Sequence, residues 1–370
     1  MCRSQRSTAV PGRWWRSSSR RSCCSRWFRC SSPGYRACCE GSIMTGLMRA
    51  DHHVRSTALP GLRLRLRERC PQAGAGGAAT PLLLVHGATV PSALWDNAAP
   101  GWSWMDMLAR DGLHVFAVDL RGYGRSGRGA VAGQATDGGP YARAREVQQD
   151  VADALAFIRE RTGAGQVDLL GGSWGSLICG MFAAGAMADQ VRRLVLYAPL
   201  YCAPGEGEGW RRAAADPADP ARIDPALAAH RQVSEAAFRA RWDEELPAGN
   251  AQAWRPEAVF RALFDECLAE DPDCVGVGAP AFRAPNGTLA DLFEVYSGRP
   301  LYDAGAIRAP TLLIRADHDR TSTRGDVLGL FDRIAAPVKQ YVEIGDGGHF
   351  VIAERRMTGV HAAVTAFLQR

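Results

Sequence analysis

Ser173 stands in the short stretch "GGSWG", which directly follows the apolar run "VDLL". A serine hydroxyl becomes a useful nucleophile only when a neighbouring base takes its proton. Glycines at 171 and 175 permit a sharp turn in which any Cβ atom would clash, and a helix beginning at Trp174 would direct its first amides toward the serine oxygen. The pattern predicts a strand, a tight turn carrying Ser173 and a helix, although a purely structural turn is an alternative.

His349 is the best candidate for the base, because it lies in the glycine-rich stretch "GDGGHF" after the last apolar run. In a doubly wound sheet this loop and the Ser173 turn reach the same carboxyl edge. Other histidines occur in strand or helix patterns or before the expected start of the fold: His52, His53, His114, His230 and His361. We therefore expect His349 to accept the proton of Ser173.

The base requires a carboxylate that holds its ring and stabilises its positive charge. Asp317 and Asp319 both follow the apolar run "TLLIRA", and therefore reach the same sheet edge. They are two residues apart, so only one of them can point toward His349. The chain order serine, aspartate, histidine is one of three known orders for such triads.

Acyl transfer also requires two preorganised amides around the developing oxyanion. The Trp174 amide, next to the nucleophile, would supply one of them, and the Ala88 amide in the loop after "LLLVHG" would supply the other. His86 in the same loop is expected to brace the loop rather than to take part in the reaction.

Alternating strand and helix patterns predict the scaffold that holds these residues. Runs such as "PLLLVHG", "HVFAVD" and "APTLLIRAD" are typical of strands buried in a parallel sheet, whereas "LRLRLRER" has the period of a strand with one solvated face. Val147, Val151, Leu155 and Ile158 form one apolar helical stripe. The fold class is therefore α/β, with a mostly parallel doubly wound sheet over residues 59–200 and 304–370.

Residues 201–303 interrupt this alternation, because they contain no convincing buried strand. A hundred residues cannot form a bare loop inside a domain, so we predict a largely helical cap inserted after the sixth strand. The candidate substrate-binding residues are three tryptophans of this segment: Trp210, Trp242 and Trp254.

The first 50 residues have a composition unlike the rest of the chain. They hold ten arginines, six of the 11 cysteines and one acidic residue, Glu40. We interpret residues 1–50 as a disordered or misannotated extension, with possible true starts at Met44 or Met48; an organelle transit peptide is an alternative. The five remaining cysteines favour a reducing cytoplasmic location over a disulfide framework.

Charge and hydropathy exclude several classes of partner. The net charge of +5 comes from the N-terminal arginines, and the remainder has four more acidic than basic residues. This distribution argues against a nucleic-acid partner. No apolar run approaches the roughly 18 residues of a membrane span, and no metal-ligand cluster or nucleotide loop is evident. We expect a small acyl substrate without a metal or cofactor.

From about residue 59 onward the chain resembles the α/β-hydrolase superfamily. The motifs that carry the resemblance are "VHGA", "DLRGYGRSG", "GGSWGS", "ADHD" and "GGHF". In related members the acid is the fourth residue of a Gly-x-x-Asp pattern, which implies Asp319 rather than Asp317, with Ala316 in the glycine position. The resemblance implies a serine hydrolase that cleaves a carboxylic ester through an acyl-enzyme on Ser173.

Within the superfamily, "GGSWGS" and "DLRGYGRS" are similar to motifs of the prolyl aminopeptidases. The chain has "HGATVPS", however, where those enzymes carry His-Gly-Gly-Pro-Gly. Their cap glutamates hold the free amine of the substrate, a part that Glu244 and Glu245 could play here. An aminopeptidase or amidase and a thioesterase are therefore alternatives, as is a binding protein without catalytic activity.

Overall fold

The computed structural model describes residues 46–72, 80–128, 139–247, 249–274, 276 and 278–370. Residues 1–45 lie outside the described residues, so for them the hypothesis of a disordered or misannotated extension stays a prediction. Its last residues, 46–50, belong to the folded chain.

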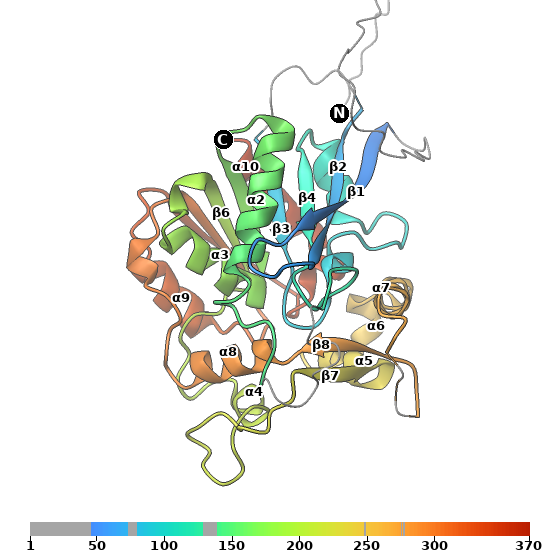
Figure 1. The fold of residues 1–370 in the computed structure, drawn as a ribbon, viewed down its shortest axis with the longest axis vertical. Coiled ribbons are helices and arrows are strands. Elements are labelled where there is room, and N and C mark those ends of the chain that lie inside the picture. Colours follow the sequence, from blue (N-terminus) through green and yellow to red (C-terminus); the bar gives the residue numbers. More distant parts are fainter. Residues whose placement is uncertain (1–45, 73–79, 129–138, 248, 275, 277) are drawn as a thin grey trace, which may run out of the picture. The chain divides into compact units, whose positions relative to one another are not determined.

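Eight strands form one sheet in the order β1-β2-β4-β3-β5-β6-β9-β10 (Figure 1). Their bounds are β1 (Leu47–Arg55), β2 (Arg63–Pro71), β3 (Leu82–Val85), β4 (Val115–Val118), β5 (Val167–Gly172), β6 (Val191–Tyr197), β9 (Thr311–Ala316) and β10 (Lys339–Ile344). The β1–β2 and β2–β4 pairs are antiparallel, and the pairs from β4 through β10 are parallel. The predicted mostly parallel sheet is confirmed.

The sheet begins earlier than the expected residue 59. β1 pairs along its whole length with β2, and its alternating exposure suits an edge strand with one solvated face. His52, expected before the fold, lies in this strand and hydrogen-bonds Glu68 at 2.6 Å. A start at Met48 would remove Leu47, the first residue of β1, whereas a start at Met44 would retain the strand.

β2 was expected to have one face in water, and this expectation is wrong. Arg65, Arg67 and Arg69 are all buried. Carboxylates from other elements cover them: Glu270 bonds Arg65 and Arg67, and Asp96 bonds Arg67 and Arg69. Arginine can be buried when its charge is paired and its donors are satisfied.

Helices cover both faces of the sheet, as a doubly wound fold requires. On one face α1 (Trp104–Arg110) contacts α10 (Met357–Leu368), and on the other α2 (Gln148–Thr162) contacts α3 (Trp174–Ala184) (Figure 1). α9 (Arg324–Arg333) packs beside β9. The predicted apolar stripe before and along α2 is buried: Val147, Val151, Leu155 and Ile158. None of the helices in the described ranges is both long and apolar enough to cross a bilayer.

Between β6 and β9 the chain forms the segment that we call the insertion, residues 201–303. Its elements lie together below the sheet in the view of Figure 1: α4 (Glu208–Arg212), β7 (His230–Ser234), α5 (Glu235–Asp243), α6 (Ala251–Trp254), α7 (Glu257–Ala269), β8 (Ala281–Pro285) and α8 (Gly287–Tyr296). β7 and β8 pair antiparallel in a sheet of their own. The sequence indicated a largely helical insertion with no convincing buried strand, and it did not reveal β7 and β8, because short strands that contain arginine and proline carry little apolar signal.

Candidate active site

Ser173 occupies the turn between β5 and α3 in a strained conformation, with φ 55° and ψ −121°. A Cβ atom at Gly171 would lie 2.2 Å from the carbonyl oxygen of Gly175. A Cβ atom at Gly175 would lie 2.5 Å from the carbonyl oxygens of Val85 and His86. Both glycines are thus required by contacts with backbone, and the predicted strand, turn and helix are present.

Ser173, His349 and Asp319 form one chain of hydrogen bonds. His349 Nε2 lies 2.9 Å from Ser173 Oγ, and His349 Nδ1 lies 2.9 Å from Asp319 Oδ2. Asp317, the alternative carboxylate, instead accepts a bond from the Gly347 amide at 3.2 Å. The structure therefore brings together the three residues that the motifs indicate and leaves Asp317 apart.

The surroundings of Asp319 keep its carboxylate ionised. Burial alone would raise its pKa, but His349 and the amide of Ser322 stabilise the charged form and hold the pKa below its ordinary value. Its Oδ1 accepts from the amides of Thr321 and Ser322 at 2.9 and 2.8 Å. An ionised Asp319 accepts the Nδ1 proton of His349, and this tautomer leaves Nε2 free to accept the proton of Ser173.

The backbone of His349 is held on both sides. Its amide donates to Glu245 Oε2 at 2.9 Å, and its carbonyl oxygen accepts from the Tyr197 hydroxyl. Glu245 belongs to the insertion and also accepts from Arg241 at 3.0 Å and from the Thr321 hydroxyl at 2.9 Å. This glutamate is fully engaged in positioning the histidine loop, so it does not present a free carboxylate to an amine. Glu244 is exposed.

The loop after β3 lies directly against the serine. A Cβ atom at Gly87 would be 3.1 Å from the Cβ and 3.6 Å from the Oγ of Ser173. His86 is buried and lies 2.9 Å from the Gly87 carbonyl through Nδ1, while its Nε2 accepts from the Leu120 amide at 3.1 Å. His86 therefore fixes the peptide group that contains the Ala88 amide, as expected of a bracing histidine. Trp174 opens α3, where amides have no intrahelical acceptor.

The family model for the alpha/beta hydrolase fold matches residues 80–355, which is more than half of the chain. The chain belongs to this family. No curated protein matches the sequence significantly.

Solved structures of α/β-hydrolases share the fold. An esterase from Thermogutta terrifontis is 22% identical with a TM-score of 0.55, over 87% of this chain and 98% of the esterase. An enol-lactonase from Burkholderia xenovorans is 18% identical with a TM-score of 0.56, over 85% and 99% of the two chains. A thioesterase domain from the curacin biosynthetic pathway is 14% identical with a TM-score of 0.52, over 87% and 100%. At these identities the likeness concerns the fold.

In this α/β-hydrolase the insertion contacts the serine turn through a residue that the sequence did not indicate. The Trp174 indole donates to Asp291 of α8 at 2.9 Å. Asp291 also accepts from the amide of Ala144 at 2.6 Å and from Arg143 at 3.0 Å. Burial raises the pKa of Asp291 although Arg143 opposes this effect. No motif surrounds Asp291, so only its contacts identify it.

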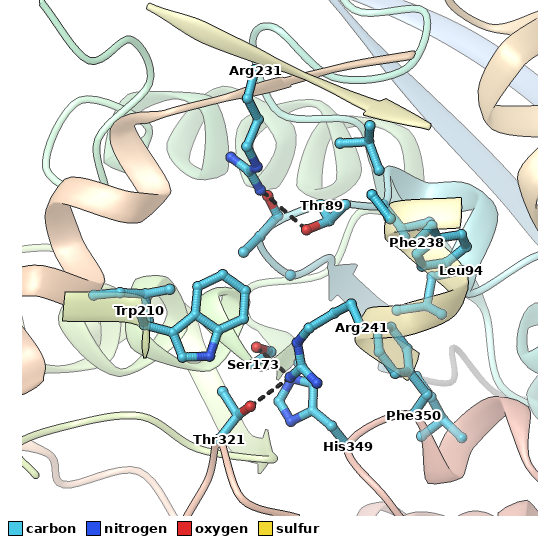
Figure 2. Close-up of a pocket in the computed structure, with 18 of the residues that line it drawn as sticks. Thr89, Leu94, Ser173, Trp210, Arg231, Phe238, Arg241, Thr321, His349 and Phe350 are labelled. Carbon is cyan, nitrogen blue, oxygen red and sulfur yellow. Dashed lines mark hydrogen bonds between the residues drawn. The ribbon is translucent and has the colours of Figure 1, made fainter. Parts of the chain in front are cut away.

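A cavity of about 220 Å³ opens beside Ser173 and His349 between the sheet and the insertion. Its walls include Trp210, Phe238, Phe350 and two arginines, Arg231 and Arg241, and no carboxylate of a described residue lines it (Figure 2). The arginines were not among the sequence candidates.

Two of the three candidate tryptophans lie elsewhere. Trp242 is buried, donates to Glu354 at 3.0 Å and stacks on Phe350. Trp254 packs its ring edge to face against His318. Of the three, only Trp210, which lies on α4, lines the cavity.

Two clusters within the described ranges bring potential metal ligands together: Glu68, Cys70 and His114, and Glu245, Asp319 and His349. In both clusters the carboxylates already accept hydrogen bonds from protein groups. Glu68 accepts from His52, His114 and Arg161 at 2.6 to 2.8 Å, which holds its pKa below the ordinary value despite burial. These contacts favour a structural role for the Glu68 cluster, whereas in the second cluster Asp319 and His349 belong to the hydrogen-bonded chain that ends at Ser173.

Proposed function

We propose that this α/β-hydrolase is a serine hydrolase that cleaves carboxylic esters through an acyl-enzyme on Ser173. The observation that supports the proposal most is the continuous hydrogen-bonded chain from Asp319 through His349 to the strained Ser173. A structural serine turn would need neither the histidine nor the buried aspartate behind it.

In the proposed reaction His349 Nε2 takes the proton of Ser173 as the serine oxygen attacks the acyl carbonyl. The amides of Trp174 and Ala88 bind the oxyanion of the tetrahedral intermediate. His349 then protonates the departing alcohol, which leaves the acyl group on Ser173. A water molecule gives its proton to His349 and attacks the acyl group, and Ser173 regains a proton as the acid departs. Asp319 stabilises the imidazolium at each step.

The cavity favours an acyl substrate without a free amine. Glu245, which could hold an amine, is bonded to His349, Thr321 and Arg241, and Glu244 is exposed. Both ionic groups in the described walls besides His349 are arginines, which repel an ammonium group. We therefore propose an ester as the substrate, in preference to a peptide with a free amino terminus. The likeness in fold to a thioesterase domain keeps a thioester as the second candidate.

We further propose that the insertion acts as a cap. Residues of α4, β7, α5 and α8 form one wall of the cavity, opposite the loops that carry Ser173 and His349. A substrate in the cavity would be enclosed between the two walls, which would limit its size and exclude water from the acyl carbonyl.

Initial rates on p-nitrophenyl butyrate and on proline p-nitroanilide test the proposal, with Ser173→Ala as the blank. We expect hydrolysis of the butyrate, no release from the anilide, and labelling of the wild-type serine by a fluorophosphonate. Faster cleavage of the anilide would support the aminopeptidase instead. Absence of both turnover and labelling would support a binding protein without catalysis.

A further inference from the structure

Arg231 of β7 extends into the cavity and reaches the loop that follows β3 (Figure 2). Its Nη2 donates to the Ala88 carbonyl at 3.0 Å and to the Thr89 hydroxyl at 3.1 Å. Its Nη1 donates to the Pro285 carbonyl at 2.9 Å and makes longer contacts with Asn286 and Thr288. All of these acceptors are neutral oxygens.

The positive charge of Arg231 therefore has no counter-ion in the described part of the chain, where no carboxylate lies within 4.0 Å of it. Arg241, the second arginine of the cavity, differs because Glu245 accepts from it at 3.0 Å. Burial lowers the pKa of Arg231, which reflects the cost of keeping this charge away from water. Elsewhere the buried arginines Arg65 and Arg67 have carboxylate partners, so an uncompensated arginine is an exception here.

Thr89 adds a hydrogen-bond donor to this charge. Its hydroxyl oxygen accepts from Arg231, so the hydroxyl hydrogen must point elsewhere. No described residue accepts that hydrogen, and Thr89 lines the cavity. A hydroxyl polarised by a guanidinium is a good donor to an anion.

We propose that the cavity takes esters that bear a carboxylate, which accepts a hydrogen bond from the Thr89 hydroxyl and lies beside the positive charge of Arg231. The inference rests on the proposed ester hydrolysis and names its substrate class. One uncompensated positive charge matches one carboxylate. Because Arg231 holds the carbonyl of Ala88, whose amide faces the acyl oxygen in our mechanism, the carboxylate would lie a few bonds from the scissile carbonyl.

Equilibrium binding tests the carboxylate site without requiring turnover. Calorimetry on the full-length Ser173→Ala protein would compare monomethyl adipate, which carries one carboxylate, with uncharged dimethyl adipate. We expect the monoester to bind about 10- to 100-fold more tightly, as hydrogen bonds to charged groups provide. Arg231→Gln should abolish this preference and Thr89→Val should reduce it.

Two further variants separate the local charge from other effects. Arg231→Lys retains a positive charge and should keep part of the preference. Arg212→Gln removes a charge from an exposed position of the insertion, where the side chain is 71% accessible, and should leave the preference unchanged. The readout is the ratio of the dissociation constants of the two ligands. Arg231 also holds the loop that carries Ala88, so its loss can weaken the binding of both ligands together.

Kinetics on the enzyme with Ser173 distinguish this inference from the proposed function. Mono-p-nitrophenyl adipate, which carries a carboxylate, should have a kcat/KM about 10-fold or more above that of its uncharged methyl ester. In Arg231→Gln the two values of kcat/KM should be equal. If the Ser173→Ala protein, which retains Arg231, binds the charged and uncharged ligands equally tightly, the carboxylate site is overturned. This holds at any rate of ester hydrolysis. Preferred binding of the charged ligand without turnover of either ester would retain the site and overturn the ester hydrolase.

Discussion

The two walls of the cavity are built by different physical means. The sheet wall carries Ser173, Asp319 and His349 on short turns after parallel strands, and its geometry comes from backbone contacts around glycines. The insertion wall carries Trp210, Arg231, Phe238 and Arg241 on short helices and a two-stranded sheet.

Buried polar contacts join the two walls. Glu245 of the insertion accepts from the amide of His349, and Asp291 accepts from the indole of Trp174. In the other direction, Glu354 of the core accepts from Trp242. The positions of His349 and Trp174 on the sheet wall therefore depend on carboxylates of the insertion wall, whereas the serine turn itself rests on backbone contacts.

The largest expected effect comes from the sheet wall. Ser173→Ala should lower the rate of ester hydrolysis by about 10⁴-fold or more, because it removes the hydroxyl that forms the acyl-enzyme in our mechanism. The melting temperature should change little, since alanine keeps the Cβ atom. A large fall in melting temperature would instead show that the serine hydroxyl stabilises the turn.

The two aspartates after β9 provide a matched pair. Asp319→Asn should lower kcat by about 10³- to 10⁴-fold, because an amide favours the wrong histidine tautomer. Asp317→Asn keeps an oxygen that can accept from the Gly347 amide and lies apart from His349, so it should have nearly wild-type activity. Initial rates at saturating ester measure both, and the reverse ranking would contradict the assignment of the acid.

A smaller effect is expected from the contact between the walls. Glu245→Gln should lower kcat about 10-fold, because the amide group cannot satisfy both Arg241 and the His349 amide as well as a carboxylate does. Its pH–rate profile should also shift, since the histidine would be less well positioned. Glu244→Gln, its exposed neighbour, is the control, and an equal effect of both would exclude positioning through the carboxylate of Glu245.

The smallest effect concerns stability and pH. Burial raises the pKa of Glu354 to about 7, from an ordinary 4.5. Between these values the folded protein binds a proton that the unfolded chain does not, so this stabilisation is present below pH 4.5 and lost as the pH rises through 7. Both oxygens of Glu354 accept hydrogen bonds, from Trp242 and from the Gly348 amide, and glutamine can satisfy only one of these donors. The unfolding free energy of Glu354→Gln should therefore carry a pH-independent loss, and should rise relative to wild type by about 1 to 3 kcal/mol from pH 5 to pH 8 because glutamine stays neutral.

Denaturant unfolding of the Glu354→Gln and wild-type proteins at several pH values checks this prediction. Glu244→Gln changes an exposed carboxylate and should show a pH-independent difference from wild type. A flat difference for Glu354→Gln as well would mean that Glu354 titrates near its ordinary pKa in the folded protein.

Much of the sheet wall could be predicted from the sequence, because its determinants are local. Glycines around Ser173, apolar runs before each turn and the order of the chemical groups are all visible in short stretches. The first strand escaped prediction, since "LMRADHHVR" contains few apolar residues and is stabilised by pairing with β2. The burial of both faces of β2 was not predicted for a related reason. Its arginines can be buried only because carboxylates distant in the sequence pair with them.

The sequence by itself determined the parallel sheet, the serine turn and its three chemical groups, because backbone sterics and hydrophobic periodicity act over a few residues. Only the tertiary structure decided that Glu245 supports the histidine, and that Arg231 faces the cavity without a counter-ion among the described residues. These outcomes depend on contacts between residues more than 100 positions apart. Charge pairing over such separations is set by packing, which leaves no periodic signal in the chain.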